Sequence, residues 1–425
     1  MIGAFFVRAG AVVTCDTNAA QNRIAFEDLG LIKDGAILIE GDRVVAIGRE
    51  EDVAARSPRE AVELDARDCV VVPGFVDAHS HPLFAGDREL DFAARIHAEK
   101  PSQGMLHTVE RTREALRDPA AFYERTVRPR LQMMLRHGTT TLETKTGYAL
   151  TMDGEFALLD LIAAHRADAD VPRLIPTFLG AHALPPEFET ADAYVEFLIS
   201  ECIPKARSRG AVFADAFCEP GYFSPEQTRR YMLEAIRHGL GVRIHCDEMA
   251  DGNASSMAAR IGADSADHCN YVDPQAVRNL VERGTVVTAC PATIAFLDLE
   301  RKAPVRQVLD AGGDVALASD FNPGTSPCFN MQTVAYFGRK LFGLSAAEAL
   351  YGVTRAAARS LHSATGVLRN GGPADFVALQ IDDPREFGWY FGGNFAEIVV
   401  KGGAIAGPST SRALACALAQ DDKDG

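Results

Sequence analysis

Short apolar runs alternate with longer amphipathic stretches through the middle of the chain. The runs have the length and composition of buried strands, whereas stretches such as 226–237 and 274–281 repeat apolar residues with the period of about 3.6 typical of helices. Eight runs are predicted strands: Cys69–Ala78, Thr139–Lys145, Arg173–Gly180, Val212–Cys218, Gly241–His245, Ala263–Asp267, Thr285–Cys290 and Asp314–Ala318. This β-then-α order predicts an α/β fold, a (β/α)8 barrel of the TIM type. A doubly wound open sheet is the alternative, but no GxGxxG phosphate loop follows a strand here.

Both ends of the chain are rich in short strands instead. Residues 35–41 and 43–48 flank the turn residues Gly41 and Asp42, which indicates a hairpin, and strand-like runs return at 374–380 and 397–401. We therefore predict one small β-sandwich domain assembled from both termini. The predicted organisation is a composite β domain at 1–70 and 364–410, a barrel at 71–363 and a polar tail at 411–425.

Charge and cysteine content exclude several classes of partner. The 425 residues include 43 Lys+Arg and 58 Asp+Glu, a net charge of −15 that argues against nucleic acid and anionic membranes as partners. An anionic small substrate remains compatible, because a local arginine can outweigh distant charge. No apolar run is long enough to span a membrane, and Arg8 interrupts the N-terminal apolar run, so we predict neither a transmembrane helix nor a signal peptide. Nine scattered cysteines without a CxxC pair favour the reducing cytoplasm.

Histidines and acids gather where the predicted strands end, the place where barrels carry their active sites. His79 and His81 close the first strand two positions apart, so both side chains point to one side. His245 ends the fifth strand, His268 follows the sixth and Asp320 follows the eighth. Such a cluster predicts a metal site.

Three imidazoles (His79, His81 and His245) and the Asp320 carboxylate suit zinc or iron(II) with one position open to water. The cation would lower the pKa of that water from 15.7 to about 7. The fourth strand offers no lysine to bridge a second ion, so one divalent metal per chain is predicted. Lys145, which ends the second strand, could be a ligand or an ion-pair partner of Glu143.

Two further side chains, Glu248 and His268, are candidates for general acid–base catalysis or for stabilising charge in the transition state. Glu248 lies three residues after His245, where it could carry protons or accept a hydrogen bond from substrate, although a solvated loop residue fits the sequence as well. His268 could stabilise the developing oxyanion or act only as a structural histidine near the site.

Several stretches resemble the amidohydrolase superfamily and, within it, the imidazolonepropionase family, over roughly residues 70–402. The motifs that carry the resemblance are Pro73–His81, Gly86–Arg88, Thr108–Arg113, Glu143–Tyr148, Thr177–His182, Ile244–Glu248, Ser265–His268 and Asp320–Pro327. His-x-His alone marks the superfamily, whereas Thr-Phe-Leu-Gly-Ala-His and Asp-Phe-Asn-Pro-Gly are much narrower.

The resemblance implies a reaction: 4-imidazolone-5-propanoate plus water gives N-formimino-L-glutamate in histidine degradation, with a Zn²⁺, Fe²⁺ or Fe³⁺ ion activating the water. It implies metal ligands at His79, His81, His245 and Asp320, and catalytic roles for Glu248, His268 and Asp320. It also implies substrate contacts at Arg88, Tyr148, His182, Glu248, Asn322, Gly324 and Thr325. Arg88 suits a carboxylate by its charge and fork geometry.

The chain departs from the family pattern after Arg95. The segment up to Thr108 is shorter than in the family and lacks a tyrosine and a triple glycine; in the family that tyrosine helps to hold the substrate's propionate. Either Ser102, Gln103 or His107 replaces the contact, or the pocket takes another ring substituent. A second departure is Cys290-Pro-Ala-Thr293, where the family usually reads Pro-Gly-Ala.

Two other functions stay open. The first is a related amidohydrolase that opens another cyclic amide, or a deaminase of aromatic amidines. The second is a scaffold without activity, which the complete ligand set disfavours. The partners expected are a small anionic cyclic amide and, by analogy with the family, a second copy of the chain in a homodimer.

Overall fold

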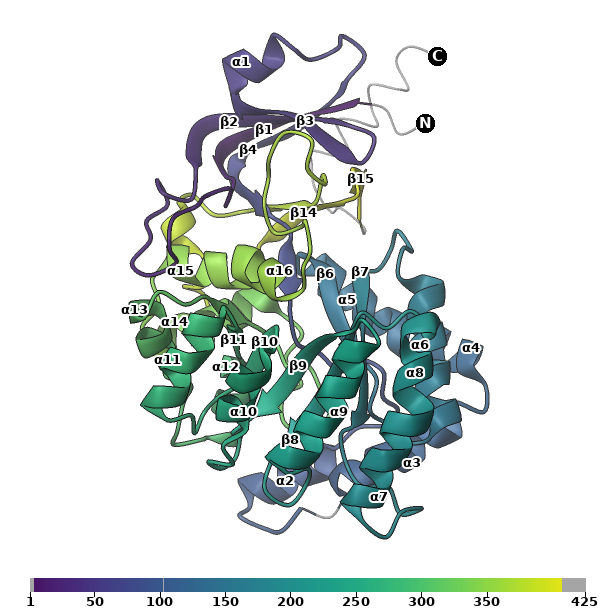
Figure 1. Cartoon of the computed structure of the whole chain (residues 1–425). Helices are drawn as coiled ribbons and strands as arrows, with labels where there is room; N and C mark the ends of the chain where they lie inside the picture. Colours follow the sequence, from purple (N-terminus) through teal and green to yellow (C-terminus); the bar gives the residue numbers. More distant parts are fainter. Residues whose placement is uncertain (1–3, 102, 407–425) are drawn as a thin grey trace.

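The structure is a computed structural model that describes residues 4–101 and 103–406 (Figure 1). Eight parallel strands form the larger sheet in the order β12-β11-β10-β9-β8-β7-β6-β5. Their bounds are β5 Phe75–Asp77, β6 Thr139–Lys145, β7 Arg173–Ala181, β8 Phe213–Cys218, β9 Gly241–Cys246, β10 Ser265–His268, β11 Val286–Ala289 and β12 Val315–Leu317. Such strands are buried on both faces, as in β6, where every residue is buried.

The two edges of this sheet meet just beyond β5 and β12. Ser80 and Phe321 form an isolated parallel bridge, in which His81 N donates to Phe321 O at 2.9 Å. Asp320 N also donates to His79 O at 2.9 Å. The strands therefore form a nearly closed barrel, which confirms the predicted TIM-like fold. The seam also brings residues 79–81 and 320 together.

The first predicted strand, Cys69–Ala78, is wrong as a single element. Its first half belongs to β4 (Val62–Pro73), which pairs with β1 and β13 in the smaller sheet, and only β5 belongs to the barrel. The chain passes between the sheets at Gly74, where a Cβ atom would overlap the side chain of Thr140. The other seven barrel strands begin and end within two residues of their predicted bounds.

Helices fill the connections between the barrel strands and cover its outside (Figure 1). The α-helices are α1 Glu50–Ala54, α2 Glu89–Ile96, α3 Gly104–Ala115, α4 Pro119–Phe122, α5 Arg128–Arg136, α6 Met152–His165, α7 Ala191–Phe197, α8 Ile203–Ala206, α9 Pro225–Arg237, α10 Ala254–Ile261, α11 Pro274–Arg283, α12 Pro291–Leu297, α13 Val305–Asp310, α14 Met331–Phe342, α15 Ala346–Tyr351 and α16 Ala357–Ser360. Ser224 starts α9 by accepting from Gln227 N, and Gln227 returns a bond to Ser224 N, which fixes this end of the predicted helix.

Single π-helical turns at 123–127, 198–202 and 352–356 link α4 to α5, α7 to α8 and α15 to α16, and short 3₁₀ turns lie at 207–209 and 384–386.

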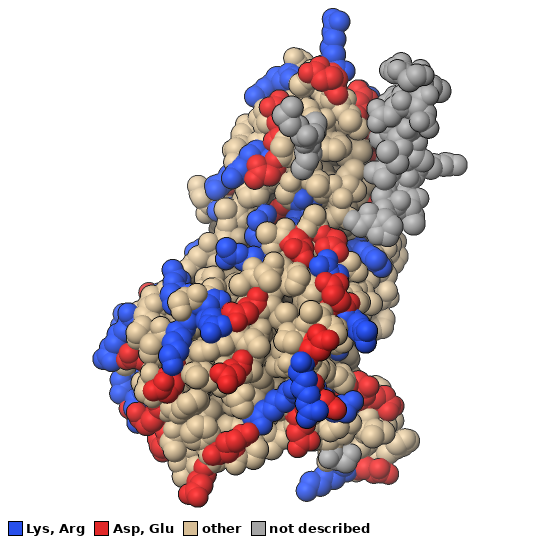
Figure 2. Space-filling model, turned by 90° about the vertical axis from the view of Figure 1, so that its right-hand side faces the viewer, with Lys and Arg blue, Asp and Glu red and all other residues tan. Residues whose placement is uncertain are grey.

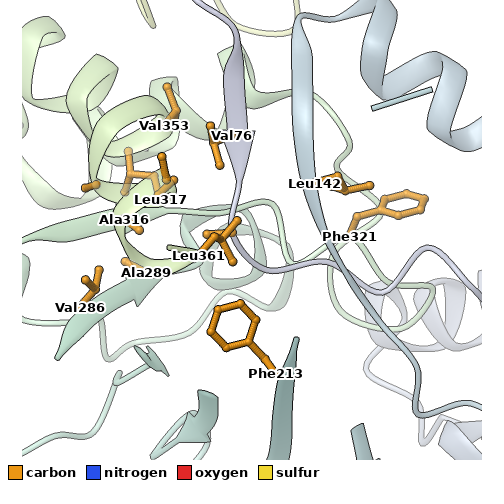
Figure 3. Packing of buried hydrophobic residues seen from close by; sticks show 14 of the residues in the cluster. Val76, Leu142, Phe213, Val286, Ala289, Ala316, Leu317, Phe321, Val353 and Leu361 are labelled. Carbon is orange, nitrogen blue, oxygen red and sulfur yellow. The ribbon is translucent and has the colours of Figure 1, made fainter. Parts of the chain in front are cut away.

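The main core fills the barrel and the space under its helices. Figure 3 shows part of it, where Val76 of β5 and Leu317 of β12 lie near Val353 and Leu361 from the last helices. This core holds the strand ends in place.

The smaller sheet has the order β15-β14-β13-β4-β1-β2-β3 and joins both ends of the described chain. Its further strands are β1 Ala4–Val13, β2 Leu31–Glu40, β3 Arg43–Arg49, β13 Phe376–Leu379, β14 Ala396–Lys401 and β15 Ala404–Ile405. Val7, Ile37 and Phe376 belong to one buried cluster, while Phe6 and Leu38 point to the opposite face near α1. The composite β domain is present; its predicted sandwich takes the form of one mixed sheet with a core on each face. The domain boundaries stay predictions, and the predicted tail at 411–425 lies outside the described residues.

Acidic and basic side chains lie interleaved over the face that Figure 2 shows, rather than in a continuous basic surface. Within residues 4–101 and 103–406, no helix combines the length and apolar character that a membrane crossing needs.

Candidate active site

Four potential ligand atoms converge at the ends of β5, β9 and β12. His81 Nε2 lies 3.2 Å from His79 Nε2 and 3.4 Å from His245 Nε2. Asp320 Oδ1 lies 3.5 Å from His79 Nε2 and 3.4 Å from His81 Nε2. Ligands about 2.0–2.1 Å from a tetrahedral zinc ion are roughly 3.3–3.4 Å apart, so this spacing fits a shared cation.

The tautomers of two histidines also favour a cation. His79 Nδ1 lies 2.6 Å from Asp267 Oδ2, and His245 Nδ1 lies 3.1 Å from Asp215 Oδ1. Because each carboxylate accepts the Nδ1 proton, each Nε2 is left with a lone pair directed at the other imidazoles. Carboxylate–histidine pairs of this kind orient metal ligands. Burial lowers the pKa of His79 and His81 well below the usual value for histidine, so both rings are neutral and able to bind a metal.

A buried ion-pair network lies beneath the histidines. Lys145 Nζ lies 2.9 Å from Glu143 Oε1 and 2.6 Å from Asp215 Oδ2, and all three side chains are fully buried. Burial acts to lower the pKa of Lys145, but the carboxylates of Asp215, Glu143 and Asp267 outweigh it and raise that pKa. The ammonium is therefore charged, and of the two alternatives left open for Lys145 the structure shows the ion pair with Glu143.

Lys145→Met is expected to lower the free energy of unfolding by about 3–5 kcal/mol, because it leaves Glu143 and Asp215 as buried charges without their cation. Urea denaturation at fixed metal content measures this loss. Lys205→Met is the matched control: Lys205 is exposed, pairs with Glu201 at 3.1 Å, and should change stability by no more than about 0.5 kcal/mol. Equal effects of the two substitutions would contradict the network's role.

Asp320, which follows β12, and His268, the last residue of β10, both have a left-handed backbone conformation, with φ of 50° and 70°. Such a conformation is costly for these residues and is concentrated at functional sites. Thr293 Oγ1 donates to Asp320 Oδ2 at 2.7 Å, and Asn322 Nδ2 donates to Asp320 O at 2.7 Å. Thr293 belongs to the second departure in the sequence, and from the first turn of α12 its hydroxyl holds the Asp320 carboxylate.

Glu248 is buried beside the histidine cluster. Its Oε2 lies 3.8 Å from His268 Nε2, and its backbone N–H donates to the Glu219 carboxylate. Burial, and then the charges of Asp320 and Glu219, raise the pKa of Glu248 well above its usual range. Both ring nitrogens of His268 are buried without a hydrogen-bond partner among the described residues, so they are available to a bound molecule.

Aromatic side chains contact the His81 ring of the cluster. The His182 ring stacks on His81 at 5.4 Å between centroids, and Tyr148 meets His182 edge-on at 5.2 Å. Burial lowers the pKa of His182 to about 3.

Asn322 stabilises the turn in the loop after β12. Its Oδ1 accepts hydrogen bonds from the backbone N–H groups of Gly324 and Thr325, at 2.8 Å each.

Every site residue predicted from the sequence lies in this region. Arg88 reaches the same loop: a Cβ atom on Gly324 would overlap Arg88 Nη1. Of the suggested replacements for the family tyrosine, Gln103 and His107 contact each other at 3.3 Å, and Ser102 lies outside the described residues.

Four side chains that hold the site were not predicted: Asp215, Asp267, Glu219 and Thr293. The signal for Asp215 was a lone charge within the apolar run Val212–Cys218, and Asp267 directly precedes His268. Glu219 follows β8 and Thr293 lies in the first turn of α12, and at neither position does spacing carry such a signal.

Comparison with known proteins agrees with this geometry. Residues 70–405 match the Amidohydrolase family. A curated imidazolonepropionase of Geobacillus kaustophilus (strain HTA426) is 36% identical over 416 residues, which are 94% of this chain and 97% of the relative. Another, of Rubrobacter xylanophilus, is 38% identical over 394 residues, 90% of this chain and 93% of the relative.

Solved structures share the fold at lower identity. Guanine deaminase of E. coli superposes with a TM-score of 0.69 at 20% identity, covering 96% of this chain and 100% of the other. A triazine hydrolase from Arthobacter aurescens has a TM-score of 0.69 at 18% identity, covering 99% of each chain. At this identity the likeness shows the fold alone.

Proposed function

Because the chain belongs to the amidohydrolase family, and within it to the imidazolonepropionases, we propose that it hydrolyses 4-imidazolone-5-propanoate to N-formimino-L-glutamate, a step of histidine degradation. The observation that carries the proposal is the convergence of three imidazole nitrogens and one carboxylate oxygen within 3.2–3.5 Å contacts. The resulting enzyme is a hydrolase that acts on the C–N bond of a cyclic amide.

The proposed ligands of a single divalent ion are His79, His81, His245 and Asp320. Neutral imidazoles and one carboxylate suit Zn²⁺ or Fe²⁺, and the same ligands accept Fe³⁺. The ion would polarise the amide carbonyl and lower the pKa of a bound water to about 7. The anchors Asp267 and Asp215 keep the His79 and His245 rings in the orientation that this binding requires.

Side chains of the protein carry out the proton transfers of the reaction. Glu248 accepts a hydrogen bond from the ring N–H and takes a proton from the attacking water. Water adds to the carbonyl carbon, and His268 donates to the carbonyl oxygen as negative charge develops there. Asp320, fixed by Thr293, relays the proton that Glu248 took from the water to the ring nitrogen as the C–N bond breaks. The products are a free formimino nitrogen and a carboxyl group, which ionises to the carboxylate.

Substrate contacts are assigned to the remaining residues. Tyr148 and His182 lie against the face of the His81 ring, where they can hold the planar imidazolone. Asn322, Gly324 and Thr325 form the turn that borders the ring, and Arg88 is the nearby cation for the propionate.

The experiment is an assay of the metal-loaded protein with freshly made imidazolonepropanoate, its products separated by chromatography. We expect N-formimino-L-glutamate and no ammonia. Ammonia with an intact ring would instead identify a deaminase, and absence of turnover would point to another cyclic amide.

We also propose a cytoplasmic homodimer, with its contact at the aromatic patch of Trp389, Tyr390 and Phe391. These consecutive side chains are 65%, 46% and 68% exposed. Phe391 packs on Tyr336 and Phe337 of α14 at 5.1 and 5.6 Å. Exposed apolar clusters of this kind mark protein interfaces, and aromatic residues contribute most to their binding energy.

Light scattering is expected to give twice the chain mass of 45.7 kDa for the native protein and a single chain mass for the double variant Trp389→Ser, Phe391→Ser. The circular dichroism spectrum, as the folding control, should stay native. A dimer that survives the double substitution would place the contact elsewhere.

A further inference from the structure

Two arginines meet at the loop that follows β12. Arg95 Nη1, from α2, donates to Gly324 O at 2.7 Å. Arg88, at the start of the same helix, stands so close to Gly324 that a Cβ atom there would overlap its Nη1. The two guanidinium groups therefore flank one residue, four positions after Asp320.

Within residues 4–101 and 103–406, some of the donors of both arginines make no hydrogen bond. Asp91 Oδ2 accepts from Arg88 Nε at 2.7 Å and lies 2.7 Å from its Nη2, which leaves Nη1. Among the described residues, Arg95 Nε and Nη2 donate no hydrogen bond, and its guanidinium carbon lies 5.9 Å from the centroid of the Phe296 ring. Each arginine thus retains at least one free N–H donor near Gly324.

The local charge is positive. Two guanidinium groups face the one carboxylate of Asp91, which the backbone N–H groups of Gln103 and Gly104 also hold, at 2.8 and 3.0 Å. Burial, and then the charge of Arg88, lower the pKa of Arg95, whereas Asp91 acts in the opposite direction. An entering carboxylate would relieve this repulsion between like charges.

The arginine pair is continuous with the catalytic cluster. Gly324 N donates to Asn322 Oδ1, and Asn322 Nδ2 donates to Asp320 O. On the other side, burial raises the pKa of the Tyr148 hydroxyl, and the charge of Arg88 opposes that effect. A molecule bound beside Tyr148 therefore lies within the field of the Arg88 guanidinium group, which adjoins Arg95 at Gly324.

We propose that Arg95 is a specificity-determining residue that forms, together with Arg88, a two-guanidinium clamp for the carboxylate on the ring substituent of the substrate. The proposal rests on the proposed function, which supplies an anionic cyclic amide. Planar guanidinium groups suit a carboxylate because both can present paired N–H donors to its two oxygens. The clamp selects the anionic side chain and takes no part in opening the ring.

The test compares Arg95→Gln with the native protein on imidazolonepropanoate and on its neutral propanamide analogue. We expect KM for the carboxylate substrate to rise roughly 10- to 100-fold with kcat nearly unchanged, since a charge-assisted contact is lost in substrate and transition state alike. The kinetic constants for the propanamide should stay within about twofold. Arg95→Lys, which keeps the charge without the fork, should fall between the two.

Arg117→Gln removes the same charge from an exposed position near the end of α3 and should leave both substrates unaffected. Equal losses on both substrates, a fall in kcat alone, or no change in Arg95→Gln would overturn the clamp.

A binding measurement tests the clamp independently of whether the protein has the proposed activity. Calorimetry with unreactive imidazole-4-propanoate and imidazole-4-propanamide measures binding to the metal-loaded protein without any turnover. Native protein should prefer the carboxylate, and Arg95→Gln should lose that preference. A native protein without the preference, or a variant that retains it, would overturn the clamp whatever the outcome of the activity assay.

Discussion

Replacing His79 or His245 with alanine is expected to remove the bound metal and to lower kcat/KM by roughly a thousandfold or more. The ion contributes several kcal/mol of transition-state stabilisation, and each 1.36 kcal/mol corresponds to a factor of ten. Both nitrogens face the shared centre and are held there by Asp267 and Asp215. Loss of either ring removes one of four ligands and takes one hydrogen-bond donor from a buried carboxylate, which keeps its contact with Arg243 (Asp267) or Lys145 (Asp215).

The measurement is metal content per chain together with steady-state rates. Asp267→Asn should give a graded result, a roughly 10- to 100-fold loss of metal affinity, because it changes the anchor rather than the ligand. His362→Ala is the control: this histidine is exposed and pairs with Asp264 at 2.9 Å. Full metal content and full activity in His79→Ala would place the centre elsewhere.

The second large effect is expected for Glu248→Gln, which should lower kcat by about 10²- to 10⁴-fold while the metal stays bound. Glutamine has the shape of glutamate but cannot take a proton, and Glu248 is the buried carboxylate that lies 3.8 Å from His268. Because the backbone N–H of residue 248 still donates to Glu219, the loop should keep its conformation.

Pre-steady-state rates and metal analysis test this prediction, with the exposed Glu226→Gln as the control of equal charge change. Loss of the metal from Glu248→Gln would show that this side chain is a ligand. Unchanged kcat would remove Glu248 from the proton transfers.

Strand positions in the barrel could be predicted where parallel strands buried on both faces are short apolar runs, as in β12. The run Cys69–Ala78 was wrongly predicted to be a single strand for the same reason. It remains largely apolar although the chain leaves the smaller sheet at Gly74 and enters the barrel. Periodicity records burial and carries no information on which sheet a strand joins.

The converging ligands could be predicted because barrel strands end at one rim, which brings His79, His245 and Asp320 together. What could not be predicted is the support around them. The hydrogen bond from Thr293 of α12 to Asp320 and the contact of Arg95 of α2 with Gly324 join helices to a loop distant in sequence, and their partners are set by tertiary packing.

Hydrolysis in oxygen-18 water is the most direct measurement of the central claim, that this site opens a cyclic amide by adding water to its carbonyl carbon. Mass spectrometry of the product from imidazolonepropanoate should find one oxygen-18 in the newly formed carboxylate of N-formimino-L-glutamate, with no ammonia released. Turnover that releases ammonia, or a product whose new carboxylate carries no label, would contradict the account.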